Sequence, residues 1–164
     1  MGEKTGGYTL VELLVVVCIA GLVCTLGVPR LDGLLASMRV RSAARVVAGD
    51  LALVRMLAVR NGRTTVLVVE PSPDCAVRFR GRRAGYRYRV EARVEARAST
   101  APRVVDLRLA AGGRVCMEMN GPDTLAVNSR GLPHGFNNRT VWVHEEGYAD
   151  TLFLSVVGRV RRTR

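Results

Sequence analysis

Residues 7–28 read GYTLVELLVVVCIAGLVCTLGV, and this stretch decides the fold. Residues 8–28 form a run of 21 in which Glu12 is the single Asp, Glu, Lys or Arg. A helix rises about 1.5 Å per residue, so the run covers roughly 30 Å, the thickness of the hydrocarbon core of a bilayer. The run therefore predicts a membrane-spanning helix.

Glu12 lies one turn into this apolar run. A carboxylate inside a bilayer is costly, so a charge kept there usually has a partner. Cleavage after Gly7 would free a positive amine at Tyr8, one helical turn from Glu12 on the same chain. The same two groups would also pair between neighbouring helices that are staggered by about a turn, and this second pairing would set the register of a polymer.

The motif from Gly7 to Leu14, GYTLVELL, resembles the N-terminal signal of type IV pilins and pseudopilins, with Tyr8 where Phe is usual. The resemblance implies that a prepilin peptidase cleaves after Gly7 and methylates Tyr8, and that Glu12 is the assembly carboxylate. Gly21 and Pro29 match the glycine and proline between which the membrane helix of that family loosens. The other implied partners are further pilins or pseudopilins and the ATPase-driven assembly platform of the inner membrane.

The resemblance also implies the organisation of the chain. It predicts a cleaved leader over residues 1–7, a single transmembrane helix over 8–28, an amphipathic spine helix over 29–62 and a β-rich globular domain over 63–164. The chain would be a single-pass protein of the cell inner membrane, with its C-terminal domain in the periplasm.

Two other kinds of N-terminal signal fit this sequence less well. A secretory signal peptide has an apolar core of about 7 to 15 residues and an Ala-x-Ala site, whereas this run is longer, contains Glu12 and is followed by no such site. A lipoprotein signal needs a small residue before its cysteine, and Cys18 and Cys24 both follow Val.

The charges that flank the run oppose the predicted topology. Lys4 precedes the run, whereas Arg30, Arg39, Arg41 and Arg45 follow it closely. The positive-inside rule alone would therefore leave the C-terminal part in the cytoplasm. We give the motif precedence over this charge count.

The composition bounds the class of protein. The chain has 164 residues, enough for one domain besides the helix, and its net charge is +11. Such an excess favours anionic partners, namely nucleic acid, acidic lipid or an acidic protein surface. His134 and His144 lie in unrelated contexts, and no nucleophile elbow or phosphate loop occurs. The sequence thus predicts no enzyme, no cofactor and no metal.

Residues 31–59 show helical periodicity that continues from the apolar run. The apolar positions recur at steps of three and four and predict one buried stripe, while Asp50 and the arginines occupy other faces. Asn61-Gly62 suits a left-handed helix end. The predicted stripe is Leu31, Leu34, Leu35, Met38, Val46, Val47, Leu51, Val54, Leu57 and Ala58.

After Gly62 the period changes to two. Residues 86–97 alternate strictly between Tyr, Val or Ala and Arg or Glu, which predicts a strand with one buried face. Other strands are predicted over 65–70, 75–80, 104–109, 114–119, 124–128, 140–144 and 151–157. The predicted fold class is α+β, a long N-terminal helix packed on antiparallel sheet.

The C-terminal part narrows the resemblance. A strand that ends in Gly158-Arg159-Val160-Arg161, with residues 128–133 upstream, resembles H-type pseudopilins and FimT-type minor pilins. The function we expect is that of an H-type minor pseudopilin of type II protein secretion, in or at the tip of the periplasmic pseudopilus. The alternative is a FimT-type minor pilin that binds DNA during uptake through Gly158, Arg159 and Arg161, a positive patch that Arg162 extends. The scarcity of nearby aromatic residues, on which bases would stack, counts against the DNA alternative. The Gly-Arg-x-Arg sequence is also explained as a strand end shared by the family.

Cys75 and Cys116 would lie in the oxidising periplasm, where two thiols tend to bridge. A bridge would close a loop of about 40 residues and stabilise the domain by roughly 3 to 4 kcal/mol in the chain-entropy model. Cys116 alternatively fills a strand position as a free thiol.

Overall fold

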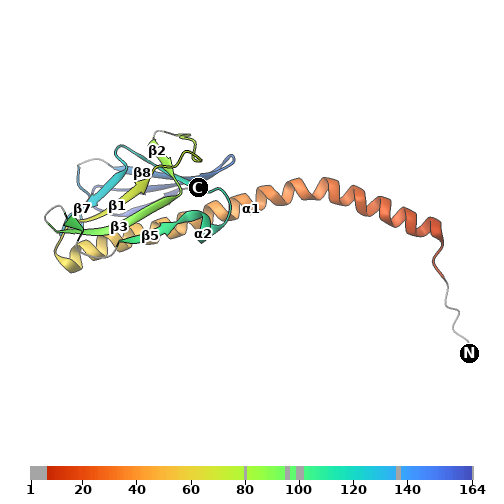
Figure 1. The fold of residues 1–164 in the computed structure, drawn as a ribbon, viewed down its shortest axis with the longest axis horizontal. Coiled ribbons are helices and arrows are strands. Elements are labelled where there is room, and N and C mark those ends of the chain that lie inside the picture. The colour runs from red at the N-terminus through yellow and green to blue at the C-terminus, as the bar shows by residue number, and fades with distance from the viewer. Residues whose placement is uncertain (1–6, 80, 95–96, 99–101, 136–137, 164) are drawn as a thin grey trace, which may run out of the picture. The chain divides into compact units, whose positions relative to one another are not determined.

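The computed structural model describes residues 7–79, 81–94, 97–98, 102–135 and 138–163, without the side chains of residues 26–30, 82, 93, 94, 97 and 98. The chain divides into two compact units, residues 1–35 and residues 36–164 (Figure 1). Helix α1, Leu10–Asn61, contributes to both. No helix among the described residues is both long and apolar enough to be identified as a membrane span. Residues 26–28 of the predicted span lie outside the described side chains.

The part of α1 in the second unit packs through small residues. The predicted stripe is correct at Val47, Leu51, Val54 and Ala58, but wrong at Leu31, Leu34, Leu35 and Met38, which are exposed. Much of the buried stripe is formed by alanines at other positions of the helix, because a small side chain lets the strands approach the helix closely. The buried positions are Ala36, Val40, Ala43, Ala44, Val47, Asp50, Leu51, Val54 and Ala58.

The end of α1 has the predicted left-handed geometry. Gly62 has a φ of 62°, and the Arg63 amide donates to the Ala58 carbonyl at 3.1 Å. This bond spans the last turn and satisfies a carbonyl that the helix leaves free.

The first antiparallel sheet has the order β4-β3-β1-β7, with β5 also paired to β3. In β3, Tyr88, Val90 and Ala92 are buried and the residues between them are not, so the predicted alternation is confirmed over residues 87–92. The strands are β1 (Thr65–Glu70), β3 (Arg87–Val94), β4 (Arg97–Ala98), β5 (Arg103–Asp106) and β7 (Thr124–Val127).

The second antiparallel sheet has the order β10-β9-β8-β6-β2. Strands β8 and β9 form a hairpin whose two-residue turn is Glu146 and Gly147. Both turn residues have positive φ, as a tight hairpin turn requires. The strands are β2 (Gly81–Gly85), β6 (Cys116–Asn120), β8 (Arg139–Glu145), β9 (Tyr148–Leu154) and β10 (Val160–Thr163).

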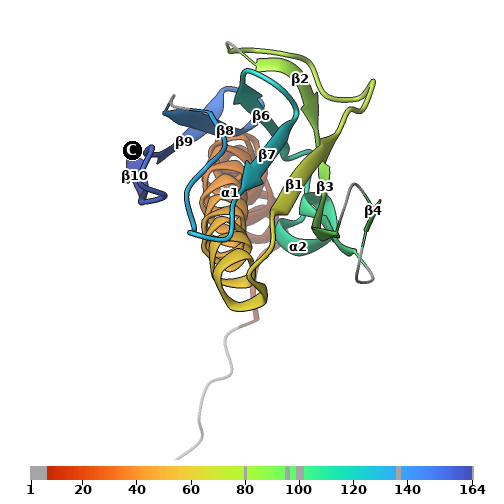
Figure 2. The same ribbon diagram turned by 90° about the vertical axis from the view of Figure 1, so that its left-hand side faces the viewer.

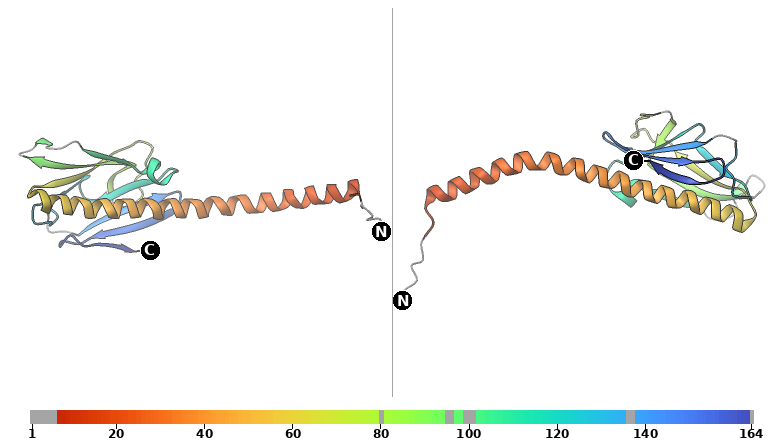
Figure 3. Two further views of the ribbon diagram at one scale, coloured as in Figure 1. Left: turned by 90° about the horizontal axis from the view of Figure 1, so that it is seen from below. Right: turned by 180° about the vertical axis from the view of Figure 1, so that it is seen from behind.

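One hydrophobic core joins the helix to both sheets. In Figure 2 the strands of the two sheets spread to either side of the C-terminal part of α1, and Figure 3 shows β9 and β10 on the opposite side of the helix from β3. Val47 and Val54 of α1 belong to the same buried cluster as Leu67 of β1 and Leu152 of β9. The predicted α+β architecture, a helix packed on antiparallel sheet, is confirmed.

Asp50 was predicted to lie on a face of α1 away from the core, but it is buried. It is only 4% exposed, the Tyr88 hydroxyl donates to its Oδ2 at 2.6 Å, and the Arg103 guanidinium lies 3.2 Å from its Oδ1. Burial and this hydrogen bond raise the pKa of Tyr88 above its usual value. The carboxylate is tolerated inside the core because both of its oxygens have partners.

Some predicted strands end or fold differently, and the strand predicted over 151–157 already ends at Leu154. Residues 75–79 are not a strand, and residue 80 lies outside the described residues. The strand predicted over 86–97 ends at Val94, and Arg97 belongs to β4, which pairs back on β3; residues 95 and 96 are outside the description. Residues 107–109 are helical because Asp106 accepts from the amides of Arg108 and Leu109 and so begins α2 (Leu107–Ala111).

Candidate functional site

The N-terminal candidates surround the start of α1. Thr9 precedes the helix, and its hydroxyl accepts from the Glu12 amide at 3.2 Å. Thr-x-x-Glu at a helix start is the capping-box pattern, and a carboxylate in the first turn interacts favourably with the helix dipole. The sequence analysis missed this role of Glu12, although the spacing of Thr9 and Glu12 signals it.

Tyr8 and Glu12 lie near one another in this structure. With Leu13 and Val16 they line a shallow hollow of about 240 Å³. Gly7 still precedes Tyr8, so the Tyr8 nitrogen is an uncharged amide and the ion pair with Glu12 stays a prediction. The loosening between Gly21 and Pro29 also stays a prediction: α1 is helical through both residues, and the Pro29 side chain lies outside the description.

Gly158 of the C-terminal motif lies in the turn between β9 and β10, so the predicted strand ending at 158–161 is wrong. Gly158 has a φ of 76°, and an added Cβ would lie 2.7 Å from the Gly131 carbonyl oxygen. Its amide donates to Ser155, and its carbonyl accepts from Arg55 Nη1 at 3.2 Å. Only glycine fits this turn, so its presence has a structural reason independent of any ligand.

The arginines after Gly158 differ in their contacts. Arg162 donates to the Asp150 carboxylate through Nε at 2.7 Å and through Nη2. Arg159 and Arg161 are exposed, and among the described residues they line a hollow of about 530 Å³ with Phe153 and Val157. Of the predicted DNA-binding set, the structure thus leaves Arg159 and Arg161 accessible and holds Arg162 in an ion pair.

A groove beside α1 continues this basic surface. It has a volume of about 640 Å³ and is lined by Arg55, Met56, Arg60 and Arg159, among others. Since Arg159 lines both hollows, they are contiguous at that residue, and no carboxylate is among the described residues that line either one.

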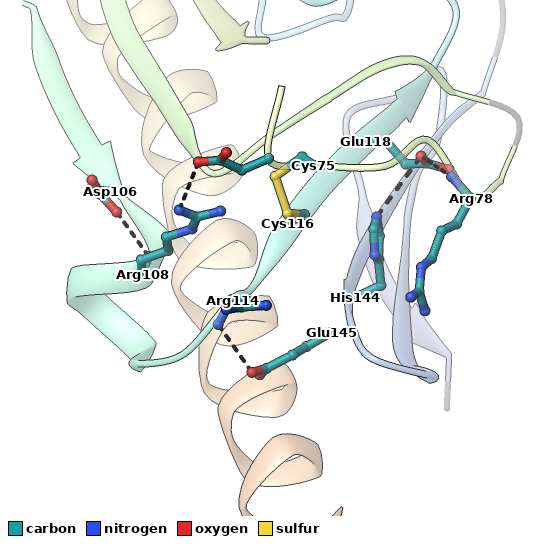
Figure 4. Close-up of a disulfide and its surroundings, with 10 residues drawn as sticks. Cys75, Arg78, Asp106, Arg108, Arg114, Cys116, Glu118, His144 and Glu145 are labelled. Atoms are coloured by element: carbon teal, nitrogen blue, oxygen red, sulfur yellow. Dashed lines mark hydrogen bonds and ion pairs between the residues drawn. A yellow bond between two sulfur atoms is a disulfide. The ribbon is translucent and has the colours of Figure 1, made fainter. Parts of the chain in front are cut away.

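Cys75 and Cys116 form a disulfide, with a Cα–Cα distance of 5.9 Å (Figure 4). The bridge ties the segment after β1 to β6. Glu118, two residues further along β6, accepts from the amides of Arg78 at 3.0 Å and Phe79 at 2.5 Å. The backbone of residues 78 and 79 therefore bonds to a buried side chain rather than to a neighbouring strand.

His144 borders the same carboxylate. Its Nε2 lies 3.9 Å from Glu118 Oε2, and the Phe79 ring meets the imidazole edge-on. Burial lowers the pKa of His144, with Glu118 opposing and Arg78 adding to this effect. His134 lies in the loop after β7, where its amide donates to Ala126. Within the described residues, no group of three His, Cys, Asp or Glu side chains is placed to hold a metal.

Comparison with known proteins bears on the fold. No protein-family model and no curated protein matches the chain. Two crystal structures of the type IV minor pilin FimU of Pseudomonas aeruginosa match with TM-scores of 0.56 and 0.58, at 16% and 15% identity. Each match covers 76% of this chain, and 92% and 88% of the respective FimU chain. The chain has a type IV pilin-like fold.

A solution structure of Escherichia coli GspH also matches, with a TM-score of 0.48 and 14% identity over 79% of this chain and 90% of GspH. The FimU likeness, at its low identity, concerns the fold and not the activity.

Proposed function

We propose that this chain is a minor subunit of a type IV pilin-like filament. The observation that carries the proposal is the coincidence of two independent features in one chain: the prepilin motif at residues 7–14 and a pilin-like domain built on the C-terminal half of the same helix. Residues 8–28 would anchor the chain once in the inner membrane before assembly, with residues 36–164 in the periplasm. Prepilin peptidase, other pilins or pseudopilins and the assembly platform would be its partners.

Assembly would depend on the charge of Glu12. After cleavage, the methylated amine of Tyr8 is positive and pairs with Glu12 of a neighbouring subunit in the apolar helix bundle. The competing explanation is that Glu12 only caps the helix. Glutamine replaces glutamate in capping boxes but carries no charge, so Glu12→Gln separates the two roles.

The test is incorporation into sheared filaments, measured by immunoblot in cells whose chromosomal copy is replaced. We expect Glu12→Gln and Glu12→Leu to enter the membrane at normal levels and both to be lost from the filament fraction. Normal incorporation of Glu12→Gln with loss of Glu12→Leu would assign Glu12 to capping instead. Thr9→Val, which removes the cap but keeps the charge, is the matched control.

We propose that the filament belongs to a type II protein secretion system, in which the chain would be an H-type minor pseudopilin. The support is the resemblance of residues 128–133 and 158–161 to the globular domain that H-type pseudopilins share with FimT-type minor pilins. Deletion of the gene should then leave secreted proteins in the periplasm while pili still form. Loss of pili with normal secretion would assign the chain to a pilus.

The second candidate function is nucleic-acid binding, as in FimT-type minor pilins. The specific observation that favours it is the accessible pair Arg159 and Arg161 on a surface that no described carboxylate lines. Arg159→Gln with Arg161→Gln should weaken binding at all sequences and lower the slope of log K against log salt by about 1.4 to 1.8, for two lost phosphate contacts. Arg41→Gln with Arg45→Gln, at two exposed arginines on α1, is the charge-matched control. Equal binding by the double variant and the control would exclude this site.

A further inference from the structure

The outer face of the second sheet carries aromatic side chains as well as arginines. Along β9, Leu152 and Leu154 are buried, so Thr151 and Phe153 lie on the opposite, outer face. Phe153 pairs with Arg161 of β10 on one side and with Thr140 of β8 on the other. Trp142, two residues along β8 from Thr140, is therefore a diagonal neighbour of Phe153 on the same face, at roughly 7 to 8 Å between Cα atoms.

Two of these aromatic groups have an accessible surface. Phe153 is 42% exposed and Phe79 is also 42% exposed. The Phe79 ring stacks on Trp142, with 5.5 Å between ring centroids and 10° between planes. Phe79 is held in that position because its amide donates to Glu118 and the Cys75–Cys116 disulfide ties down its segment. The face thus presents two ring surfaces, Phe153 of β9 and Phe79 of the loop that covers Trp142.

The charges of this face suit a phosphate chain. Arg161 pairs with Phe153 across the strands, and exposed Arg159 lines the same hollow as these two residues. Glu118, the carboxylate of this face in β6, is buried and accepts from two backbone amides. Asp150 is held by Arg162 on the opposite face. Anionic groups that approach Phe153 therefore meet guanidinium groups.

We propose that this face binds nucleic acid as a single strand, with phosphates on Arg159 and Arg161 and unpaired bases stacked on Phe153 and Phe79. The proposal rests on the nucleic-acid function proposed above and adds the strand form and the two aromatic residues. A base-paired duplex keeps its bases in the stack, so it would contact the arginines but not the rings. Stacking on aromatic side chains tolerates any base. The binding is therefore sequence-tolerant but strand-selective.

The chain provides its own probe. Trp142 is its single tryptophan and lies under Phe79 on this face. The experiment is titration of the full-length chain in mild detergent with oligo-dT or with a duplex of the same length, at low salt, followed by tryptophan fluorescence. We expect oligo-dT to change the Trp142 emission and to bind about fivefold or more tightly than the duplex.

Phe153→Leu keeps an apolar side chain but removes the ring. It should weaken oligo-dT binding about fivefold or more and leave duplex binding unchanged. Tyr148→Leu is the matched control, because Tyr148 is 43% exposed on the same strand but lies on the opposite face. Unchanged thermal melting of both variants shows that they fold.

The outcomes separate the two proposals. Equal affinity for both DNA forms, or equal behaviour of Phe153→Leu and Tyr148→Leu, overturns the stacking proposal; nucleic-acid binding still stands if Arg159→Gln with Arg161→Gln weakens both forms. No binding of either form by the wild-type chain overturns both proposals. Displacement of oligo-dT by poly-glutamate at equal charge would assign the face to an acidic protein partner and overturn the strand-selective site.

Discussion

The two ends of helix α1 bury different kinds of residue. Over residues 10–25 the large aliphatic side chains are exposed, for example Leu14 at 57%. Over residues 36–61 one stripe of small and medium side chains is buried, and Ala44 and Val47 in it have no exposed surface. Burial in this helix is therefore set by what packs against each part and not by hydrophobicity. The second part packs into the core with both sheets of its own chain. Under the proposed function, the first part would be covered by the membrane and then by neighbouring subunits.

The largest expected effect is in the second part. Val47→Asp places an unpaired carboxylate in the core that joins α1 to both sheets. We expect the free energy of unfolding to fall by at least about 4 kcal/mol, which would leave the domain unfolded or nearly so. Urea unfolding of the full chain in detergent, followed by Trp142 fluorescence, measures it. A stable Val47→Asp domain would show that this stretch of α1 is not part of the core.

The four cysteines allow a direct comparison between the two parts of the chain. Cys75→Ser with Cys116→Ser opens a loop with a sequence separation of 41 residues, which should cost roughly 4 kcal/mol in the chain-entropy model. Cys18→Ser with Cys24→Ser changes two free, exposed thiols and should leave urea unfolding of the domain unchanged. Equal midpoints for the two double variants would contradict the contrast.

Tyr88→Phe removes the hydroxyl that donates to buried Asp50. Because the other Asp50 oxygen keeps Arg103, we expect a loss of roughly 1.5 to 3 kcal/mol at neutral pH. The pKa of Tyr88 is raised in the folded state, so its contribution is full below the unfolded value of about 10 and is lost as pH rises through the folded value. The stability difference between wild type and Tyr88→Phe should therefore shrink above about pH 10. A difference that is constant with pH would exclude the buried tyrosine as its source.

The smallest expected effect comes from Leu14→Ala. The substitution removes a large apolar side chain, which in a core costs about 2 to 5 kcal/mol. Leu14 is mostly exposed, so the unfolding free energy of the domain should change by less than about 0.5 kcal/mol. A loss of several kcal/mol would show that residues 10–25 support the folding of residues 36–164, against the comparison drawn here.

The spacing of residues along the chain correctly predicted those elements whose signals lie within a short stretch of sequence. Helix α1, its end at Gly62 and the alternation of β3 follow from residue spacing, because each reflects one buried face or one backbone conformation. The segment at residues 75–79 was predicted as a strand because Val77 and Phe79 alternate with arginines. Its backbone is held instead by Glu118, some 40 residues away, and no local pattern encodes that contact.

At the C-terminal surface, too, the sequence motif could be read locally, whereas the contacts made between strands could not. Of the three arginines that the motif predicted, Arg159 and Arg161 are exposed, whereas Asp150 engages Arg162 across the hairpin. The motif missed Phe153, because the ring reaches Arg161 through strand pairing and not through sequence proximity. The helix start at Asp106, in contrast, was detectable, because an aspartate before a helical turn is a common cap.

Processing of residues 7–14 as a prepilin signal can be read directly by mass spectrometry of the N-terminal peptide of the chain purified from its own membranes. We expect a mature chain that begins at Tyr8 and carries one methyl group on its amine. A chain that retains Gly7, or one cleaved beyond Glu12, would contradict it.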